Sequence, residues 1–161
     1  EQILLNSHSQ GDIDVSIARI FGCFSERSNK EWSGGHVPLF IDKALKGEDI
    51  IIHGDGKQTR CMSYVSDIVN GLVSIMDNFD ACNGDIFNLG TEEEMSVLDH
   101  AKIIKKMTDS GSKIVFISEE EAHGKYKDIR RRKPNLEKVK NLIDYVPKTS
   151  FEESLKKVIR R

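Results

Sequence analysis

Short runs rich in β-branched residues alternate with segments of helical periodicity along this chain, and this order constrains its fold more than any other feature. Strands are predicted where extended apolar runs occur, at residues 14–21, 49–53, 85–90 and 113–117. Helices are predicted where apolar residues recur every three or four positions, at residues 36–46, 68–79, 97–108, 136–145 and from 151 onward. Such alternation is typical of α/β proteins, so the sequence predicts an α/β fold.

Capping residues predict where the helices begin. SVLD at 96–99 and SFEE at 150–153 have the spacing of a capping box. Asp67 and Asn135 are predicted to cap the helices that follow them. Residues 118–133 are polar and are predicted to form a long loop, which in a compact domain is usually functional or mobile.

The composition excludes several classes of protein. A formal charge of −2 over 161 residues gives no overall field that would attract nucleic acid. No apolar run is long enough to span a membrane, and the first residues lack a secretory signal, so a cytoplasmic protein is expected. The three cysteines form no CxxC pair and the five histidines stand apart, so neither disulfides nor a metal site is predicted.

Two polar clusters carry candidate chemistry. The first is GDGKQTR at 54–60, where glycines let the backbone approach a ligand and Arg60 offers a bidentate fork to phosphate, with Gln58 on the same side. The second is KYKDIRRRKP at 125–134, with three consecutive arginines before a helix. Together they could clamp a diphosphate. The alternatives are a GDG turn that only closes a hairpin and a basic run that only faces solvent.

Four segments, in this order, resemble a known family. They are IARIFGCFSER, VPLFIDKALKGEDIIIHGDGKQTRCMSYVSDIVNGL, IFNLGTEEEMSV and DIRRRKPNLEKVKNLIDYVPKTSFEESL. The chain closely resembles the C-terminal half of the NAD-dependent epimerase/dehydratase family, the extended short-chain dehydrogenases that act on nucleotide sugars. These segments most resemble the UDP-glucuronate decarboxylase and UDP-glucose 4-epimerase branches.

The resemblance implies the C-terminal part of a Rossmann-type fold together with a small α/β substrate-binding domain. Residues 1–22 would be the tail of the Rossmann half, and residues 23–161 mainly the substrate-binding domain. Segments at about 60–90 would return to the Rossmann sheet. In this family the Rossmann half holds NAD, the smaller domain holds the nucleotide sugar, and the reaction starts with hydride transfer to NAD.

The resemblance also implies a set of substrate-binding residues and no catalytic or metal-binding residue. Arg60 and Arg132 would hold the diphosphate, with Gln58 beside Arg60 and Arg131 as the fallback for Arg132. The residues expected to border the nucleobase and ribose are Ile52, His53, Val37, Pro38 and Phe40.

The chain departs from the family pattern after the strand at 14–21. Gly22 stands where the family has a substrate-contacting Asn, and Ser25 and Glu26 replace a Gly-Pro pair. The lost amide removes a hydrogen-bond donor and an acceptor near the substrate. This implies either a changed sugar preference or a divergent paralogue with weakened activity.

Two family motifs are absent from the sequence. It contains neither GxxGxxG nor GxGxxG for NAD, and none of its three tyrosines stands in YxxxK, the motif of the catalytic base. The chain is therefore expected to be the substrate-binding half of a longer enzyme, inactive and without NAD when alone. Its expected partners are a UDP- or dTDP-sugar, a missing N-terminal Rossmann half and, in the full-length form, a second copy. The alternative is a non-catalytic nucleotide-sugar-binding or interaction module that lacks the NAD site.

Overall fold

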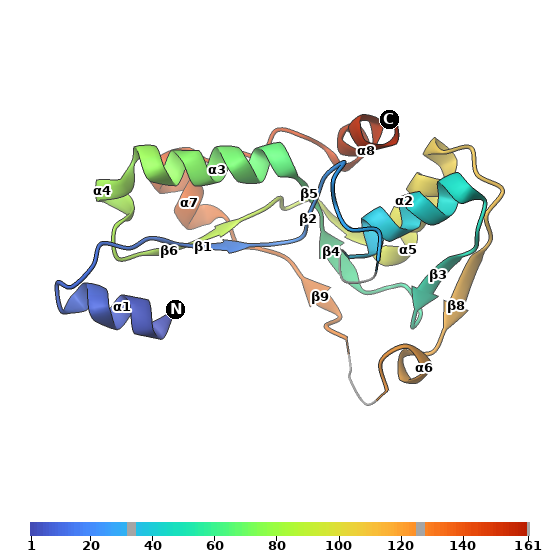
Figure 1. Ribbon diagram of the computed structural model, residues 1–161, viewed down its shortest axis with the longest axis horizontal. Helices are drawn as coiled ribbons and strands as arrows, with labels where there is room; N and C mark the ends of the chain where they lie inside the picture. The colour runs from blue at the N-terminus through green and yellow to red at the C-terminus, as the bar shows by residue number, and fades with distance from the viewer. Residues whose placement is uncertain (32–34, 125–127, 161) are drawn as a thin grey trace.

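The computed structural model describes residues 1–31, 35–124 and 128–160 and shows two lobes (Figure 1). The β1–β6 lobe holds two parallel strands flanked by helices. Its elements are α1 (Gln2–Ser9), β1 (Ile17–Ile20), α3 (Val65–Asp77), α4 (Phe79–Cys82), β6 (Ile86–Leu89) and α7 (Glu137–Ile143). In Figure 1, α3 lies above the strand pair and α1 below it. Ile17 of β1 is in register with Ile86 of β6.

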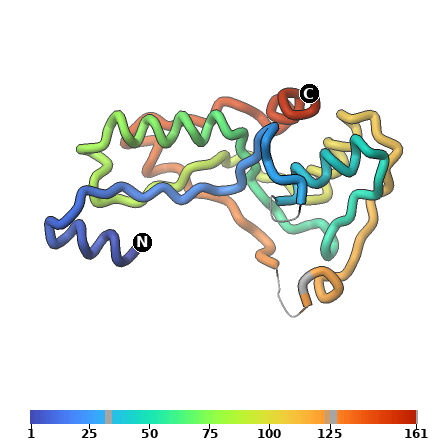
Figure 2. Tube along the Cα trace, viewed as in Figure 1, coloured from blue at the N-terminus to red at the C-terminus, as the bar shows by residue number. Residues whose placement is uncertain are grey.

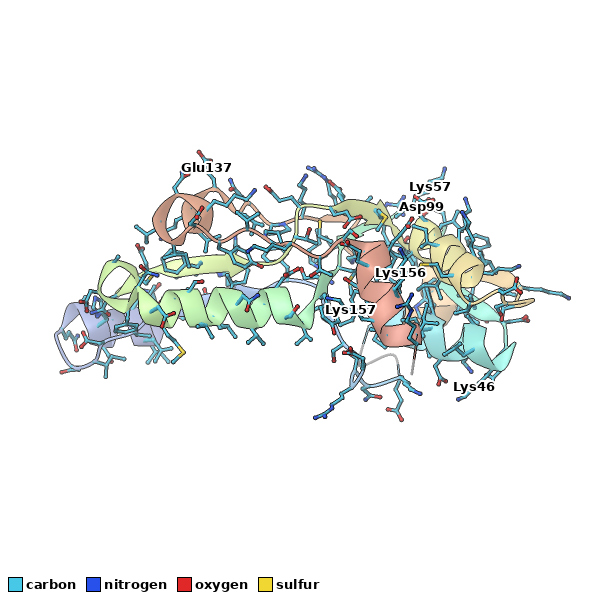
Figure 3. The ribbon with its side chains drawn as sticks, turned by 90° about the horizontal axis from the view of Figure 1, so that it is seen from above. Lys46, Lys57, Asp99, Glu137, Lys156 and Lys157 are labelled. Carbon is cyan, nitrogen blue, oxygen red and sulfur yellow. The ribbon has the colours of Figure 1, made fainter. Side chains whose placement is uncertain are left out.

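The β3–β8 lobe is built from a second parallel strand pair and the helices that pack on it. Its elements are α2 (His36–Lys46), β3 (Ile50–His53), α5 (Val97–Met107), β8 (Ile114–Ile117), α6 (Glu119–His123) and α8 (Phe151–Ile159). Figure 3 marks α8 by Lys156 and Lys157, at the junction of the two lobes. The tube in Figure 2 shows the chain crossing between the lobes more than once, so neither lobe is one continuous segment.

Short strands join the lobes. β2 (Cys23–Phe24) pairs in parallel with β5 (Ser63–Tyr64). A three-stranded sheet has β4 (Thr59–Cys61) at its centre, antiparallel to β7 (Glu94–Ser96) and parallel to β9 (Arg131–Arg132). The α/β fold predicted from the sequence is confirmed, with mostly parallel pairing. In the part of the chain that the structure covers, no helix has the length and apolarity needed to cross a bilayer.

Each lobe has its own apolar core. The core of the β3–β8 lobe includes Phe40 from α2, Ile52 from β3, Ile104 from α5 and Leu155 from α8, all nearly without exposed surface. The core of the β1–β6 lobe gathers side chains from α3, β6, α7 and the residue before α7, namely Ile68, Ile75, Phe87, Leu89, Leu136, Val139 and Ile143. Full burial of such side chains stabilises a fold by about 1.5–3 kcal/mol each.

Several predicted boundaries change in the structure. Asp67 does not cap a helix: α3 already begins at Val65, directly after β5, and the Asp67 carboxylate accepts a hydrogen bond of 3.0 Å from the Thr149 amide. The side chain of Asn135 does accept from the Glu137 amide at 2.8 Å, although α7 begins after Leu136. The loop predicted at 118–133 contains α6 and β9.

Candidate functional site

The register of β4 and β9 brings together two arginines that are far apart in the sequence. Arg60 lies opposite Arg132 in the parallel ladder, and Thr59 lies opposite Arg131. Residues paired in register point to the same face of a sheet, and neighbouring residues along a strand point to opposite faces. Arg60 and Arg132 therefore share one face, and Arg131 belongs to the other.

Arg60 is a buried guanidinium with a full set of acceptors. Its side chain is 7% exposed. One terminal nitrogen, Nη1, donates to the carbonyl oxygens of Thr59 and Ile129 at 2.8 and 2.7 Å. The other, Nη2, donates to both carboxylate oxygens of Asp128 at 2.7 Å. A buried cation needs such partners, and they fix the orientation of its fork. The sequence predicted the arginine but not its carboxylate partner.

Arg131 is held on the opposite face of the sheet by Glu94. Its Nε and Nη2 donate to the two carboxylate oxygens of Glu94 at 2.9 and 3.0 Å. Thr59 donates to the same carboxylate at 2.6 Å. The hydrogen bonds from Arg131 and Thr59 lower the pKa of Glu94 to about 2. As the predicted fallback for Arg132, Arg131 therefore does not share the face that carries Arg60.

The GDG turn does not close a hairpin, because β3 before it pairs with β8 and not with β4. Instead, Asp55 in the turn accepts hydrogen bonds from both terminal nitrogens of Arg130 at 2.9 and 3.0 Å and from the Lys57 amide at 2.9 Å. The hydrogen bonds from Arg130 and then from Lys57 lower the pKa of Asp55 to about 2. The two basic clusters found in the sequence are thus tied together through this turn.

Gln58 stands two residues before Arg60 in the sequence and is buried, with 5% exposure. Its amide nitrogen donates to the carbonyl of His53 at 2.9 Å. Its amide oxygen, Oε1, is buried without a hydrogen-bond partner among the described residues. A buried amide oxygen without a partner is unfavourable, so a donor that reached this atom would gain a hydrogen bond.

The predicted pocket residues differ in exposure. Val37, Phe40 and Ile52 are core residues with 0%, 1% and 0% exposure. His53 is half-buried at the end of β3. Pro38 lies in the first turn of α2 and is also buried. The apolar members of this set shape the scaffold, because almost none of their surface is open in this structure.

Two buried histidines, which the sequence analysis did not pair, lie behind the arginines. Nε2 of His36 and Nδ1 of His100 are 3.0 Å apart. Burial lowers the pKa of His100 to about 4, with Asp99 opposing the shift and Arg60 adding to it. Burial, His100, Arg60 and Arg132 hold the pKa of His36 well below its ordinary value. The sequence did hold one signal, because His100 occupies the apolar face formed by the buried residues of α5.

The structure gives a steric reason for Gly22. A Cβ atom at this position would lie 2.6 Å from the carbonyl oxygen of Cys61 and 2.6 Å from Sδ of Met62. Real Cβ contacts are essentially never that short. The space that a side chain at position 22 would need is therefore filled by the backbone of Cys61 and by Met62.

Over residues 1–31, 35–124 and 128–160, no group of three or more His, Cys, Asp or Glu side chains could hold a metal ion. What the site offers is two side chains that carry guanidinium groups on one face of the sheet. Guanidinium forks match the oxygens of phosphate groups, so this arrangement is chemically suited to a diphosphate.

Comparisons with known proteins show which family the chain resembles. A model of the NAD dependent epimerase/dehydratase family matches residues 1–90. The chain is 38% identical to a UDP-N-acetyl-alpha-D-glucosaminuronate decarboxylase of Bacillus cytotoxicus, covering 99% of this chain and 50% of that protein. It is 39% identical to UDP-glucuronic acid decarboxylase 1 of Xenopus tropicalis, covering 93% of this chain and 34% of that protein. The structure of Pal from Bacillus thuringiensis superposes with a TM-score of 0.88 at 26% identity, covering 99% of this chain and 49% of that one.

Proposed function

Because the chain belongs to the NAD-dependent epimerase/dehydratase family, we propose that it is the nucleotide-sugar-binding half of such an enzyme. The chain spans about half the length of the Bacillus cytotoxicus relative and about a third of the Xenopus one. In this proposal Arg60 and Arg132 hold the diphosphate of a UDP- or dTDP-sugar. The observation that carries it is the β4–β9 register, which sets both guanidinium-bearing side chains on one face.

The electrostatics of the pair support a doubly charged ligand. Arg60 is oriented in advance by Asp128 and by two backbone carbonyls, so little side-chain freedom would be lost on binding. Arg132 is exposed on the same face and can approach a ligand from solvent. A diphosphate on this face would gain charge-assisted hydrogen bonds from the exposed fork of Arg132, and it would gain them from Arg60 by replacing Asp128 as the acceptor of Nη2.

The names of the relatives favour a UDP-linked uronic acid as the sugar class. Both relatives described above are decarboxylases of such compounds. We extend this to the present chain as part of the proposal. The reaction that follows sugar oxidation would then be carried out by the complete enzyme.

We propose that this chain does not supply the turn that holds the pyrophosphate of NAD. In this fold the pyrophosphate of NAD is held by a glycine-rich turn between a strand and a helix. Here β5 runs directly into α3, and β7 runs directly into α5, with no glycine at either junction. We therefore propose that this chain binds the substrate and carries out no step of hydride transfer.

Calorimetric titration of the chain with UDP-glucuronic acid tests the proposal. Arg132→Ala is expected to weaken binding by roughly 1.5–3 kcal/mol, since a charge-assisted hydrogen bond is lost. The matched control is Arg131→Ala, an exposed arginine of the same strand that faces Glu94 on the other side of the sheet.

Arg60→Ala serves as a second variant, checked by thermal melting because it leaves Asp128 without its buried partner. A folded wild-type chain that binds no UDP-sugar would refute the proposal. Equal losses from Arg131→Ala and Arg132→Ala would remove Arg132 from the site.

A further inference from the structure

The two buried histidines have no role in the proposed diphosphate site, yet the charges of its arginines act on them. We propose that His36 and His100 form a proton-linked pair that makes nucleotide-sugar binding at Arg60 and Arg132 tighter as the pH falls. This inference rests on the proposed function and adds its regulation by pH. It is carried by the geometry of the pair and by the groups that surround it.

The pair joins two helices of the β3–β8 lobe. His36 is the first residue of α2, and His100 lies in the first turns of α5. The bonded nitrogens are 3.0 Å apart, and the ring centroids are 5.0 Å apart. Phe151 of α8 covers the ring of His100 at a centroid distance of 4.5 Å. Since a hydrogen bond between two imidazoles needs one donor and one acceptor, the pair can hold at most one extra proton.

The second ring nitrogen of His100, Nε2, is the position at which the extra proton would bind. Nε2 of His100 is buried and has no hydrogen-bond partner within the described part of the chain. Buried N–H groups without acceptors are rarer than acceptors without donors. We therefore assign the hydrogen of neutral His100 to Nδ1, from where it donates to Nε2 of His36. The free lone pair on Nε2 of His100 is then the site of protonation.

The charges around the pair oppose this protonation in the free protein. Arg60 on β4 acts on both rings, and Arg132 on β9 acts on His36. The carboxylate that favours the proton is Asp99 of α5. Asp128, which pairs with Arg60, offsets part of that guanidinium charge. A bound diphosphate would bring further negative charge to the same two arginines and so would raise the proton affinity of His100.

Because the two binding events are thermodynamically linked, protonation must in turn strengthen ligand binding. If the ligand favours the proton, the proton favours the ligand by the same factor. The pKa of free His100 is about 4. A rise of one to two units on binding would give about a twofold to tenfold gain in affinity at about pH 5 relative to about pH 7.5. Affinity should be flat above the bound-state pKa, should rise as the pH falls through it, and should level off below the free-state pKa.

The test is titration of the chain with UDP-glucose, whose diphosphate diester keeps its charge over this range. Measurements at about pH 5 and about pH 7.5, each in two buffers of different ionisation heat, count the protons taken up. Uptake is expected at the lower pH and none at the higher pH. His100→Phe should abolish the uptake and leave the affinity at about pH 7.5 near that of wild type. The control is His8→Gln on α1, which lies in the other lobe (Figure 1).

The outcomes separate this inference from the proposed function. UDP-glucose binding without proton uptake in wild type would overturn the role of the pair and leave the diphosphate site intact. A folded chain that binds no UDP-glucose at either pH would overturn both. If His100→Phe does not fold, His100→Gln takes its place, and proton uptake that persists unchanged in a folded His100→Gln variant would also refute the inference.

Discussion

At the scale of single residues, Gly22 shows how close neighbouring atoms can leave no room for a side chain. Its place in the sequence indicates the loss of a substrate-contacting amide. The structure adds that the carbonyl oxygen of Cys61 and the sulfur of Met62 occupy the place of a Cβ atom. Restoring the amide would therefore require a shift in β4 and in the residue after it.

Gly22→Asn is expected to lower the free energy of unfolding by about 1–3 kcal/mol, because overpacking forces the backbone and side chains apart. Urea denaturation measures the change. Gly111→Asn is the matched control, since a Cβ there meets nothing within 4 Å and the glycine does not need a positive φ. Equal losses at both positions would show that Gly22 is not constrained by its neighbours.

His100 predicts a pH dependence of stability. Its pKa is about 4 in the folded chain and has its ordinary value of about 6.5 in the unfolded chain. The unfolded state binds more protons between these values, so stability is constant above about pH 6.5 and falls as the pH is lowered toward 4. Over the interval from about pH 6.5 to about pH 5 the loss is roughly 2 kcal/mol.

Urea midpoints at the two pH values measure this loss. His100→Phe should reduce the pH dependence, and His8→Gln should leave it unchanged. An identical pH dependence in wild type and His100→Phe would contradict the assignment of a buried neutral histidine.

The sequence predicted some site residues and missed others for a physical reason. Arg60 and Arg132 were expected to act together, and the β4–β9 register sets them side by side. Their role on a diphosphate stays a prediction. Asp128 could not be chosen as the partner of Arg60, because the sequence does not reveal how the segment before β9 folds back. The pairing of His36 with His100 depends in the same way on how α2 packs against α5.

At the scale of elements, the two Ser-x-x-acid signals predicted their helix starts correctly, the predicted cap Asp67 was wrong, and β9 was not predicted. Ser150 and Glu153 form the complete capping box that SFEE predicts, and Ser96 accepts from the Asp99 amide as SVLD predicts. These contacts lie within four residues, so the sequence contains them. β9 has two residues and exists only through pairing with β4, which no local pattern encodes.

Ser150→Ala tests the weight of the capping box at α8. The change removes the acceptor for the Glu153 amide and is expected to cost about 1 kcal/mol of stability. The effect should reach the whole fold, because Phe151 and Leu155 of α8 belong to the core of the β3–β8 lobe. Thermal or urea denaturation provides the measurement.

Ser118→Ala is the matched control, since Ser118 caps the five-residue α6 with the same type of bond. If Ser118→Ala lowered stability as much as Ser150→Ala, the stability contributed by a helix cap would not depend on how deeply the helix is buried.

At the scale of the whole molecule, the two helices on opposite sides of the β1–β6 strand pair, α3 and α1, both expose apolar side chains (Figure 1). Val69, Val73 and Met76 on α3 are 49%, 47% and 72% exposed. Ile3 on α1 is 80% exposed. Exposed apolar surface of this kind favours association in water. Both apolar cores are buried, and these apolar side chains still remain in contact with solvent.

We expect the chain alone to self-associate as its concentration rises, and Val73→Lys to reduce that association without lowering the melting temperature. Light scattering coupled to size-exclusion chromatography measures the change in mass. The companion variant is Val115→Lys on β8, in the other lobe and away from α3. A wild-type chain that stays monomeric at all accessible concentrations would show that this surface does not drive association.

The run of basic residues around β9 affects how well the site tolerates a one-residue shift in strand register. Side chains along a strand alternate, so a slip of one position normally exchanges the two faces of a strand. Here the neighbours of Arg132 are Arg131 and Lys133. A one-residue insertion or deletion in the preceding connection would still deliver a cation opposite Arg60. This redundancy allows the length of that connection to drift over evolutionary time while the positive charge beside Arg60 is kept.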